Sequence, residues 1–235
     1  MILSGAHTHQ HNAPFIATEN GDMPGKKQKL IVLQLNEVNF DIVKQYAKVS
    51  NLPGFSRLLS EFTPITTFSE TEYHELEPWI QWVSIQTGKP FQEHQVFRLG
   101  DIVLKPHAQI FEAFESKGYR VGAISPMNAR NELKNPAYFI PDPWTQTEPD
   151  SSGFSRRLTS MLRQTVNDNA EGAISTRSKL ILIEAIFRTI NSSGTGRLFK
   201  MILASRHKPW MKAMVLDQLI HLIHMSLMKQ RAADV

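Results

Sequence analysis

A carboxylate at the end of an apolar run is the feature of this sequence best suited to chemistry. The run covers residues 30–37 (LIVLQLNE) and leads into a helix-like segment that begins at Asn39. Residues 30–36 predict a buried strand, and sites in open α/β sheets form at the carboxyl ends of strands. Glu37 is therefore a candidate metal ligand or base, and the alternative is a side chain that caps the following helix.

Two histidines in the last predicted helix are a second place where chemistry is conceivable. His221 and His224 are three residues apart, so they share one helix face, and Asp217 precedes them by one turn. Paired histidines on a helix can bind a metal ion. Because Leu, Ile and Met residues surround this pair, the sequence favours histidines of the interior or of an interface.

The elements that must position Glu37 alternate between strands and helices. Pro78 at a first helical position and Gly88 at the end delimit one helix, and Gly118 ends another. This alternation predicts an α/β domain with a mostly parallel sheet flanked by helices. The predicted elements are strands over 30–36, 63–68 and 119–124, and helices over 39–49, 55–62, 77–88 and 106–117.

The second half of the chain predicts helices only. They cover residues 154–168, 173–191, 195–206 and 209–230. The last of them is apolar on nearly every face, so it should be buried or should pair with another chain in self-association. We predict three parts: a strand-like, His-rich segment with a linker over 1–29, an α/β core over 30–150, and a helical region over 151–235.

Composition excludes several classes of protein. The chain has 235 residues and no cysteine, which rules out disulfides, thiolate catalysis and Cys-ligated zinc. The net charge is +4, but Lys and Arg are scattered, which argues against a dedicated nucleic-acid surface. No signal peptide and no run of about 18 uncharged apolar residues is present. We expect a soluble, cytoplasmic protein without a membrane span.

One segment of the chain resembles a known family. A helix that ends in Thr87-Gly88 is followed by Pro90 and His94, and the apolar strand with its acid, Glu37, lies some tens of residues earlier. This arrangement resembles the alkaline phosphatase superfamily, in particular its type I phosphodiesterase and nucleotide-pyrophosphatase-like branch. The resemblance covers about residues 30–130, and more weakly the helical half. It implies an alkaline-phosphatase-like α/β core that is divergent or incomplete.

Three departures from the family pattern bear on activity. Active members usually have Asp where this chain has Glu37, and the nucleophilic Ser or Thr position is occupied by Pro78. The late Asp and His ligands of the family have no obvious counterpart here. The remaining candidates near the helix start are Thr71, as the alkoxide, and Glu77. A surface hydroxyl and an acid at a helix start are the alternatives for these two residues.

The amino-terminal segment resembles a later metal-ligand segment of the family. There a strand runs into an Ala-His phrase with a second His four residues on, as Ala6-His7 and His11 do here. In relatives this piece follows a helix that ends like residues 229–235 of this chain. The resemblance therefore implies a rearranged chain or a fragment, and the alternative is a flexible leader whose histidines have no function.

The resemblance implies a metal-dependent hydrolase of a small-molecule phosphate or related ester. Glu37, His7 and His11 would bind a divalent metal ion, most often zinc in this superfamily, with Thr71 and Glu77 as the catalytic candidates. The rival hypothesis is a catalytically inactive relative that binds a ligand or partner at the same strand ends. A third possibility is a fragment whose site a partner chain completes.

Overall fold

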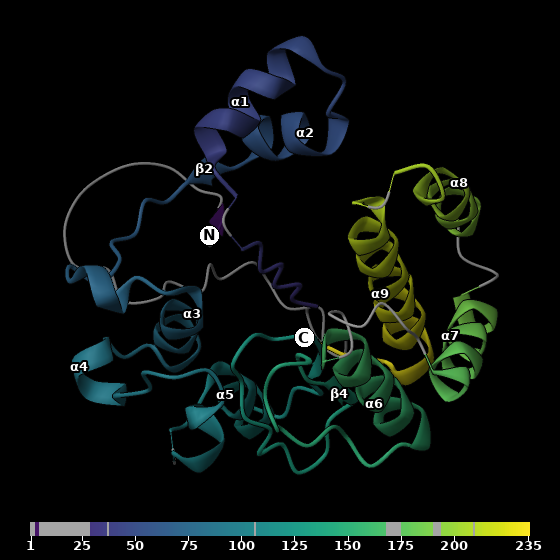
Figure 1. The fold of residues 1–235 in the computed structure, drawn as a ribbon. Helices are drawn as coiled ribbons and strands as arrows, with labels where there is room; N and C mark the ends of the chain where they lie inside the picture. The colour runs from purple at the N-terminus through teal and green to yellow at the C-terminus, as the bar shows by residue number, and fades with distance from the viewer. Residues whose placement is uncertain are drawn as a thin grey trace, which may run out of the picture. The chain divides into compact units, whose positions relative to one another are not determined.

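The computed structural model describes residues 3–4, 29–36, 38–105, 107–167, 175–189, 194–208 and 210–235 (Figure 1). The chain divides into two compact units, Met1–Ser69 and Glu70–Val235. Each unit is described by itself. The predicted boundaries after residues 29 and 150 stay a prediction.

The first unit contains two helices and a short antiparallel pair of strands. Helix α1 (Phe40–Val49) begins after Asn39, whose Oδ1 accepts hydrogen bonds from the N–H groups of Asp41 and Ile42 at 2.9 and 3.1 Å. Helix α2 (Pro53–Glu61) has its proline in the first turn. Strands β1 (Leu3–Ser4) and β2 (Thr63–Pro64) pair antiparallel.

The predicted strand over residues 30–36 is wrong for the part of the chain that the structure describes. These residues carry no strand, and the side chains of Leu30, Ile31, Val32, Leu33 and Leu35 are exposed. A strand is stable only where a neighbour accepts and donates its backbone hydrogen bonds, and no described segment pairs with this one. Apolar composition alone therefore did not decide the conformation.

The second unit contains most of the described elements, and it includes the helices predicted at Pro78 and before Gly118. It has 3₁₀ turns η1 (Tyr73–Glu75) and η2 (Asp101–Leu104), helices α3 (Pro78–Thr87), α4 (Phe91–His94), α5 (Ile110–Ser116), α6 (Gly153–Asn167), α7 (Thr176–Thr189), α8 (Thr195–Ser205) and α9 (Met211–Arg231), and strands β3 (Gly122–Ile124) and β4 (Tyr138–Ile140).

The second unit contains a small parallel sheet of two strands. Strands β3 and β4 pair in parallel, with Ala123 opposite Phe139. The carboxyl-terminal residues run beside β3, because the N–H of Gly122 donates to the carbonyl of Val235 at 2.7 Å. The described residues are thus mostly helical with a small parallel sheet, which agrees with the α/β prediction at that level. A larger alkaline-phosphatase-like sheet stays a prediction.

The main core joins β4 to the four carboxyl-terminal helices, which lie where the sequence predicted helices only. A separate helical region after residue 150 stays a prediction. Helix α9 contacts α7 and α8, and α6 contacts α7 and β4 (Figure 1). The buried side chains of α9 are Leu219, Leu222, Ile223 and Leu227. The chain itself therefore covers this face of α9, and self-association through α9 stays a prediction. No helix among the described residues is long and apolar enough to cross a membrane.

Candidate anion-binding site

The residues predicted from sequence to do chemistry do not form a site in the described part of the chain. Thr71 and Glu77 are both exposed, and Glu77 is the N-cap residue of α3 without a side-chain hydrogen bond to that helix. Glu37, His7 and His11 lie outside the described residues. Among the residues that are described, no group of three or more His, Asp or Glu side chains could hold a metal ion.

The segment around Thr87 that resembles the alkaline phosphatase superfamily has a structural role at the end of α3. Pro78 stands in the first turn of α3, and Gly88 ends the helix in the left-handed region at φ 66°. The Thr87 hydroxyl donates to the Val83 carbonyl at 2.7 Å and accepts from the Lys89 N–H at 3.3 Å. These contacts explain the Pro, Thr and Gly residues by helix geometry.

The buried His94 forms a hydrogen-bonded chain with the partly buried Ser84 and Glu70. The Val96 N–H donates to Nδ1 of His94 at 3.0 Å, so the ring proton of the neutral imidazole is on Nε2. Nε2 lies 3.0 Å from the Ser84 hydroxyl, which donates to Oε1 of Glu70 at 3.0 Å. His94 therefore gives a hydrogen bond to the serine, whereas a general base would have to accept one.

Burial keeps His94 uncharged. The ring is fully buried, and burial is the main cause that lowers the pKa of His94 to about 4; the positive potentials of His107 and Lys105 add to this effect, and Glu70 opposes it. A neutral His94 fits the proton arrangement described above. This Ser–His–Glu chain thus holds α3, α4 and the preceding loop together and is not a nucleophilic triad.

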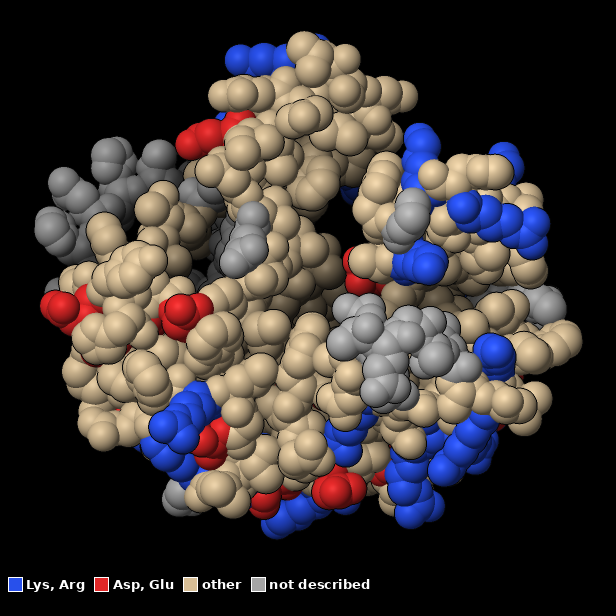
Figure 2. Space-filling view, in the orientation of Figure 1, with Lys and Arg blue, Asp and Glu red and all other residues tan. Residues whose placement is uncertain are grey.

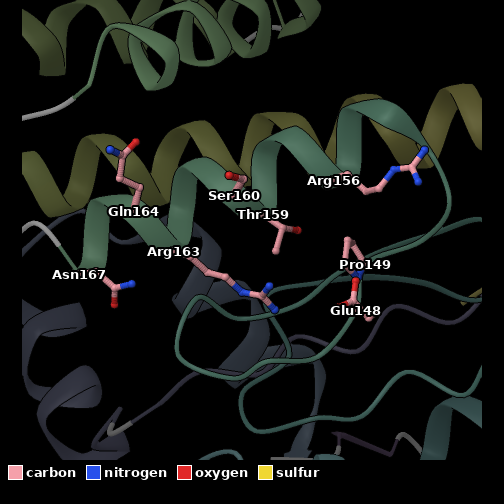
Figure 3. A pocket seen from close by; sticks show the side chains of 8 residues that line it. All are labelled: Glu148, Pro149, Arg156, Thr159, Ser160, Arg163, Gln164 and Asn167. Atoms are coloured by element: carbon pink, nitrogen blue, oxygen red, sulfur yellow. The ribbon is translucent and has the colours of Figure 1, made fainter.

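The described residues form a pocket of about 500 Å³ along one face of α6 (Figure 3). This volume lies in the range of small-molecule sites, which is roughly 300–1,000 Å³. Figure 3 shows Thr159 and Arg163 pointing from α6 toward the loop that carries Glu148 and Pro149. The pocket is lined by Glu148, Pro149, Arg156, Thr159, Ser160, Arg163, Gln164 and Asn167.

Two donors in this pocket have no hydrogen-bond partner. Thr159 is 1 % exposed and its Oγ1 is unpartnered, and Nε of Arg163 is also buried and unpartnered. The Arg163 guanidinium is fixed nevertheless, because its terminal nitrogen donates to the carbonyls of Thr145 and Thr147 at 2.8 and 2.6 Å. Unsatisfied buried donors are rare in folded proteins, and both of these donors are suited to a ligand oxygen that accepts hydrogen bonds.

Asp142 holds in place the loop that positions Arg163. Its fully buried carboxylate accepts four hydrogen bonds: from the N–H groups of Asn128, Trp144 and Thr145, and from the Thr145 hydroxyl, at 2.8–3.0 Å. The Thr147 hydroxyl in turn donates to the carbonyl of Ala129. The two carbonyl groups that hold Arg163 therefore belong to a rigid segment.

Asp150 joins the far end of the same loop to α6 and β4. Its carboxylate accepts from the Phe139 N–H at 2.8 Å, the Ser155 hydroxyl at 2.6 Å and the Ser152 N–H at 2.8 Å, and Arg231 lies 3.5 Å away. Burial alone would raise the pKa of Asp150, but the hydrogen bonds from Ser155, Phe139 and Ser152 together lower it. An ionised Asp150 thus fixes the start of α6.

The charges around the pocket favour an anion. Arg156 and Arg163 outnumber Glu148, and neither arginine forms an ion pair among the described residues. The neighbouring Arg157 points elsewhere and pairs with Glu184 at 2.7 Å. The pocket can accept negative charge, and Glu148 can accept a hydrogen bond from a hydroxyl or amine of the same ligand.

Comparison with protein-family models, with curated proteins and with solved structures finds no match for this chain. The likeness to the alkaline phosphatase superfamily therefore stays an expectation from the sequence.

The α6 pocket was missed when the sequence was considered alone, although a signal exists. The buried side chains Phe154, Leu158, Met161 and Leu162 form one stripe of α6, and the polar residues of the pocket follow the same helical spacing on another face. A polar face on a helix normally meets solvent. Only the loop before α6 turns this one into a pocket.

Proposed function

We propose that this chain binds a small-molecule phosphate or related ester in the α6 pocket. The proposal takes up the hypothesis of a catalytically inactive, alkaline-phosphatase-like binding protein, but it places the ligand on α6 and not at the strand ends. The family resemblance supports the fold part of this hypothesis. The observation that carries it is Arg163, a fixed cation with an unpartnered Nε beside the unpartnered Thr159 hydroxyl.

The pocket has complementary groups for both parts of such a ligand. Phosphate oxygens accept hydrogen bonds, so one of them can take those of Arg163 Nε and the Thr159 hydroxyl. Arg156 is exposed and extends away from Arg163 in Figure 3, so its side chain can turn without breaking an ion pair. Glu148 is suited to an alcohol hydroxyl on the rest of the ligand, a group that inorganic phosphate lacks.

Removing the hydrogen-bond donors Arg156 or Thr159 from the α6 pocket should weaken binding of glycerol phosphate. We expect Arg156→Gln to lower the affinity roughly tenfold or more, because a charge-assisted hydrogen bond contributes about 1.5–3 kcal/mol. Thr159→Val should lower the affinity several-fold and raise the free energy of unfolding by about 1 kcal/mol, since it removes an unsatisfied buried hydroxyl. Titration calorimetry and urea denaturation measure the two quantities.

Arg157→Gln is the matched control for Arg156→Gln. It removes the adjacent arginine of the same helix, which pairs with Glu184 outside the pocket, and it should leave the affinity unchanged. The proposal is wrong if glycerol phosphate does not bind, or if Arg157→Gln and Arg156→Gln weaken binding equally. Thr159→Val keeps the test valid because it is expected to stabilise the fold.

Metal-dependent hydrolysis of a phosphate ester is the second candidate function, supported by the family resemblance of the sequence. The carboxylate of Glu37 and the imidazoles of His7 and His11 are ligand types that zinc accepts. A bound divalent metal ion would polarise a phosphoryl oxygen and lower the pKa of an attacking oxygen. Thr71 and Glu77 remain the catalytic candidates of this hypothesis.

Metal analysis of the purified protein tests the second candidate directly. This second hypothesis predicts stoichiometric zinc in the unaltered chain and its loss in both Glu37→Ala and His7→Ala, because a shared site loses most of its affinity with one ligand. His74→Ala changes an exposed histidine and is the control that should retain the metal. Trace metal at the same level in all four proteins would rule the shared site out.

A further inference from the structure

Helix α8 and the segment that follows it expose large apolar side chains. Phe199 is 48 % exposed, Leu203 57 % and Trp210 65 %. Phe199 and Leu203 are four residues apart and therefore share a face of α8. Single exposed apolar residues are common, but two on one helix face with a tryptophan close by in sequence indicate an interaction surface.

The packing of α8 does not use these side chains. The helix buries Thr195 and Leu198 and contacts α9, and Gly194 at its start lies so close to Leu222 of α9 that a Cβ would stand 2.5 Å from that side chain. The core of the unit thus takes the side of α8 that carries Thr195, Leu198 and Ile202, and Phe199 and Leu203 lie exposed on the flank next to it.

Helix α8 and the segment that follows it also carry positive charge, with no acidic residue among the basic ones. Between Glu184 and Asp217 the sequence has six Lys and Arg residues and no Asp or Glu. Blue side chains lie over the region of α8 in Figure 2. The exposed basic residues of α8 and the following segment are Arg197, Lys200, Arg206, Lys208 and Lys212. None of these five forms an ion pair with another described residue.

We propose that this surface docks onto an anionic phospholipid bilayer. We define the α8 surface as Arg197, Phe199, Lys200, Leu203, Lys208 and Trp210. Helices that lie in the membrane interface combine Lys and Arg with Phe, Leu and Trp in this way. The uninterrupted positive charge is complementary to anionic headgroups, and the apolar side chains can enter the boundary of the acyl chains.

The residue types of the α8 surface indicate which part of the bilayer each side chain would contact. Phe199 and Leu203 would insert, and Lys200 and Arg197 would reach the headgroup phosphates beside them. Lys208 Nζ lies 6.0 Å from the centre of the Trp210 ring, which places a cation beside an amphipathic ring suited to the headgroup level. A nucleic acid would use the charges but not Leu203, and this difference separates the two partners.

Sedimentation with lipid vesicles tests the proposal on the full chain. We expect binding to vesicles with about one third phosphatidylglycerol at about 0.1 M salt, where exposed charges act over about 10 Å, and little binding to pure phosphatidylcholine. Phe199→Ser with Leu203→Ser, and Lys200→Glu with Lys208→Glu, should each lower the bound fraction at least tenfold. Addition of anionic vesicles should shift the fluorescence of Trp210 to shorter wavelength, and Trp210→Phe should remove that shift.

Matched double variants elsewhere in the same unit serve as controls. Ile85→Ser with Leu104→Ser alters exposed apolar residues, and Lys117→Glu with Lys134→Glu alters exposed charges. Both should bind vesicles like the unaltered chain. The proposal is overturned by equal binding to neutral vesicles, by an absence of vesicle binding, or by polyuridylate binding that persists in Phe199→Ser with Leu203→Ser and outcompetes the vesicles. None of these outcomes depends on the α6 pocket.

Discussion

Asp142→Asn should lower the free energy of unfolding of this chain by about 3 kcal/mol. The buried carboxylate accepts four hydrogen bonds, three of them from backbone N–H groups. An asparagine side chain has only one acceptor oxygen. Its NH₂ group would therefore stand opposite either the Asn128 N–H or the Trp144 N–H, and two donors cannot form a hydrogen bond with each other. Each unsatisfied buried donor costs about 1–3 kcal/mol, and the charge-assisted bonds are lost as well. Urea denaturation at neutral pH measures the change.

The matched control for this substitution is Asp101→Asn. Asp101 is partly exposed and accepts a hydrogen bond of 3.2 Å from the Arg98 N–H, so its replacement should change stability by less than about 1 kcal/mol. Asp142→Asn should also weaken binding of glycerol phosphate, because the loop that it anchors carries the two carbonyl groups that hold Arg163. Equal stability of the two variants would contradict the assigned role of Asp142.

The second large effect is a loss of stability in mild acid that His94 causes. The pKa of His94 is lowered from 6.5 to about 4 in the folded chain, because burial removes the water that would stabilise the charged imidazolium. Between these two pH values the unfolded chain binds a proton and the folded chain does not. Stability due to His94 is therefore complete above about pH 6.5 and falls by roughly 3 kcal/mol as the pH approaches 4.

His94→Asn isolates this contribution. Asparagine can accept the hydrogen bond of the Val96 N–H, as Nδ1 of His94 does, but it does not titrate in this range. We expect the variant to be less stable at neutral pH and to lose less stability on acidification than the unaltered chain. His224, whose pKa burial also lowers, adds a dependence of the same sign to both proteins. An unchanged difference in stability between them from neutral pH to about pH 4 would disprove the role of His94.

Local sequence signals predicted the helices well where the responsible interactions are local. Pro78 and Gly88 delimit α3 as expected, because a first-turn proline lacks the N–H that would be unsatisfied there and a glycine accepts the left-handed region. Four apolar residues of α9, Leu219, Leu222, Ile223 and Leu227, are buried as the pattern predicted, whereas Met214 near its start is exposed. Residues 30–36 show the limit of the same reasoning, since their composition suits a strand but no described segment pairs with them.

The sequence by itself determined the α-helices other than α4, the absence of cysteine chemistry and the position of strand β3 before Ser125. Tertiary structure alone decided the candidate site. Arg163 is one arginine among many until the carbonyls of Thr145 and Thr147 fix it, and the unpartnered Thr159 becomes evident only when the neighbouring loop covers it. Burial and hydrogen-bond satisfaction depend on residues brought together from distant parts of a chain, and sequence periodicity reports only on neighbours within one element.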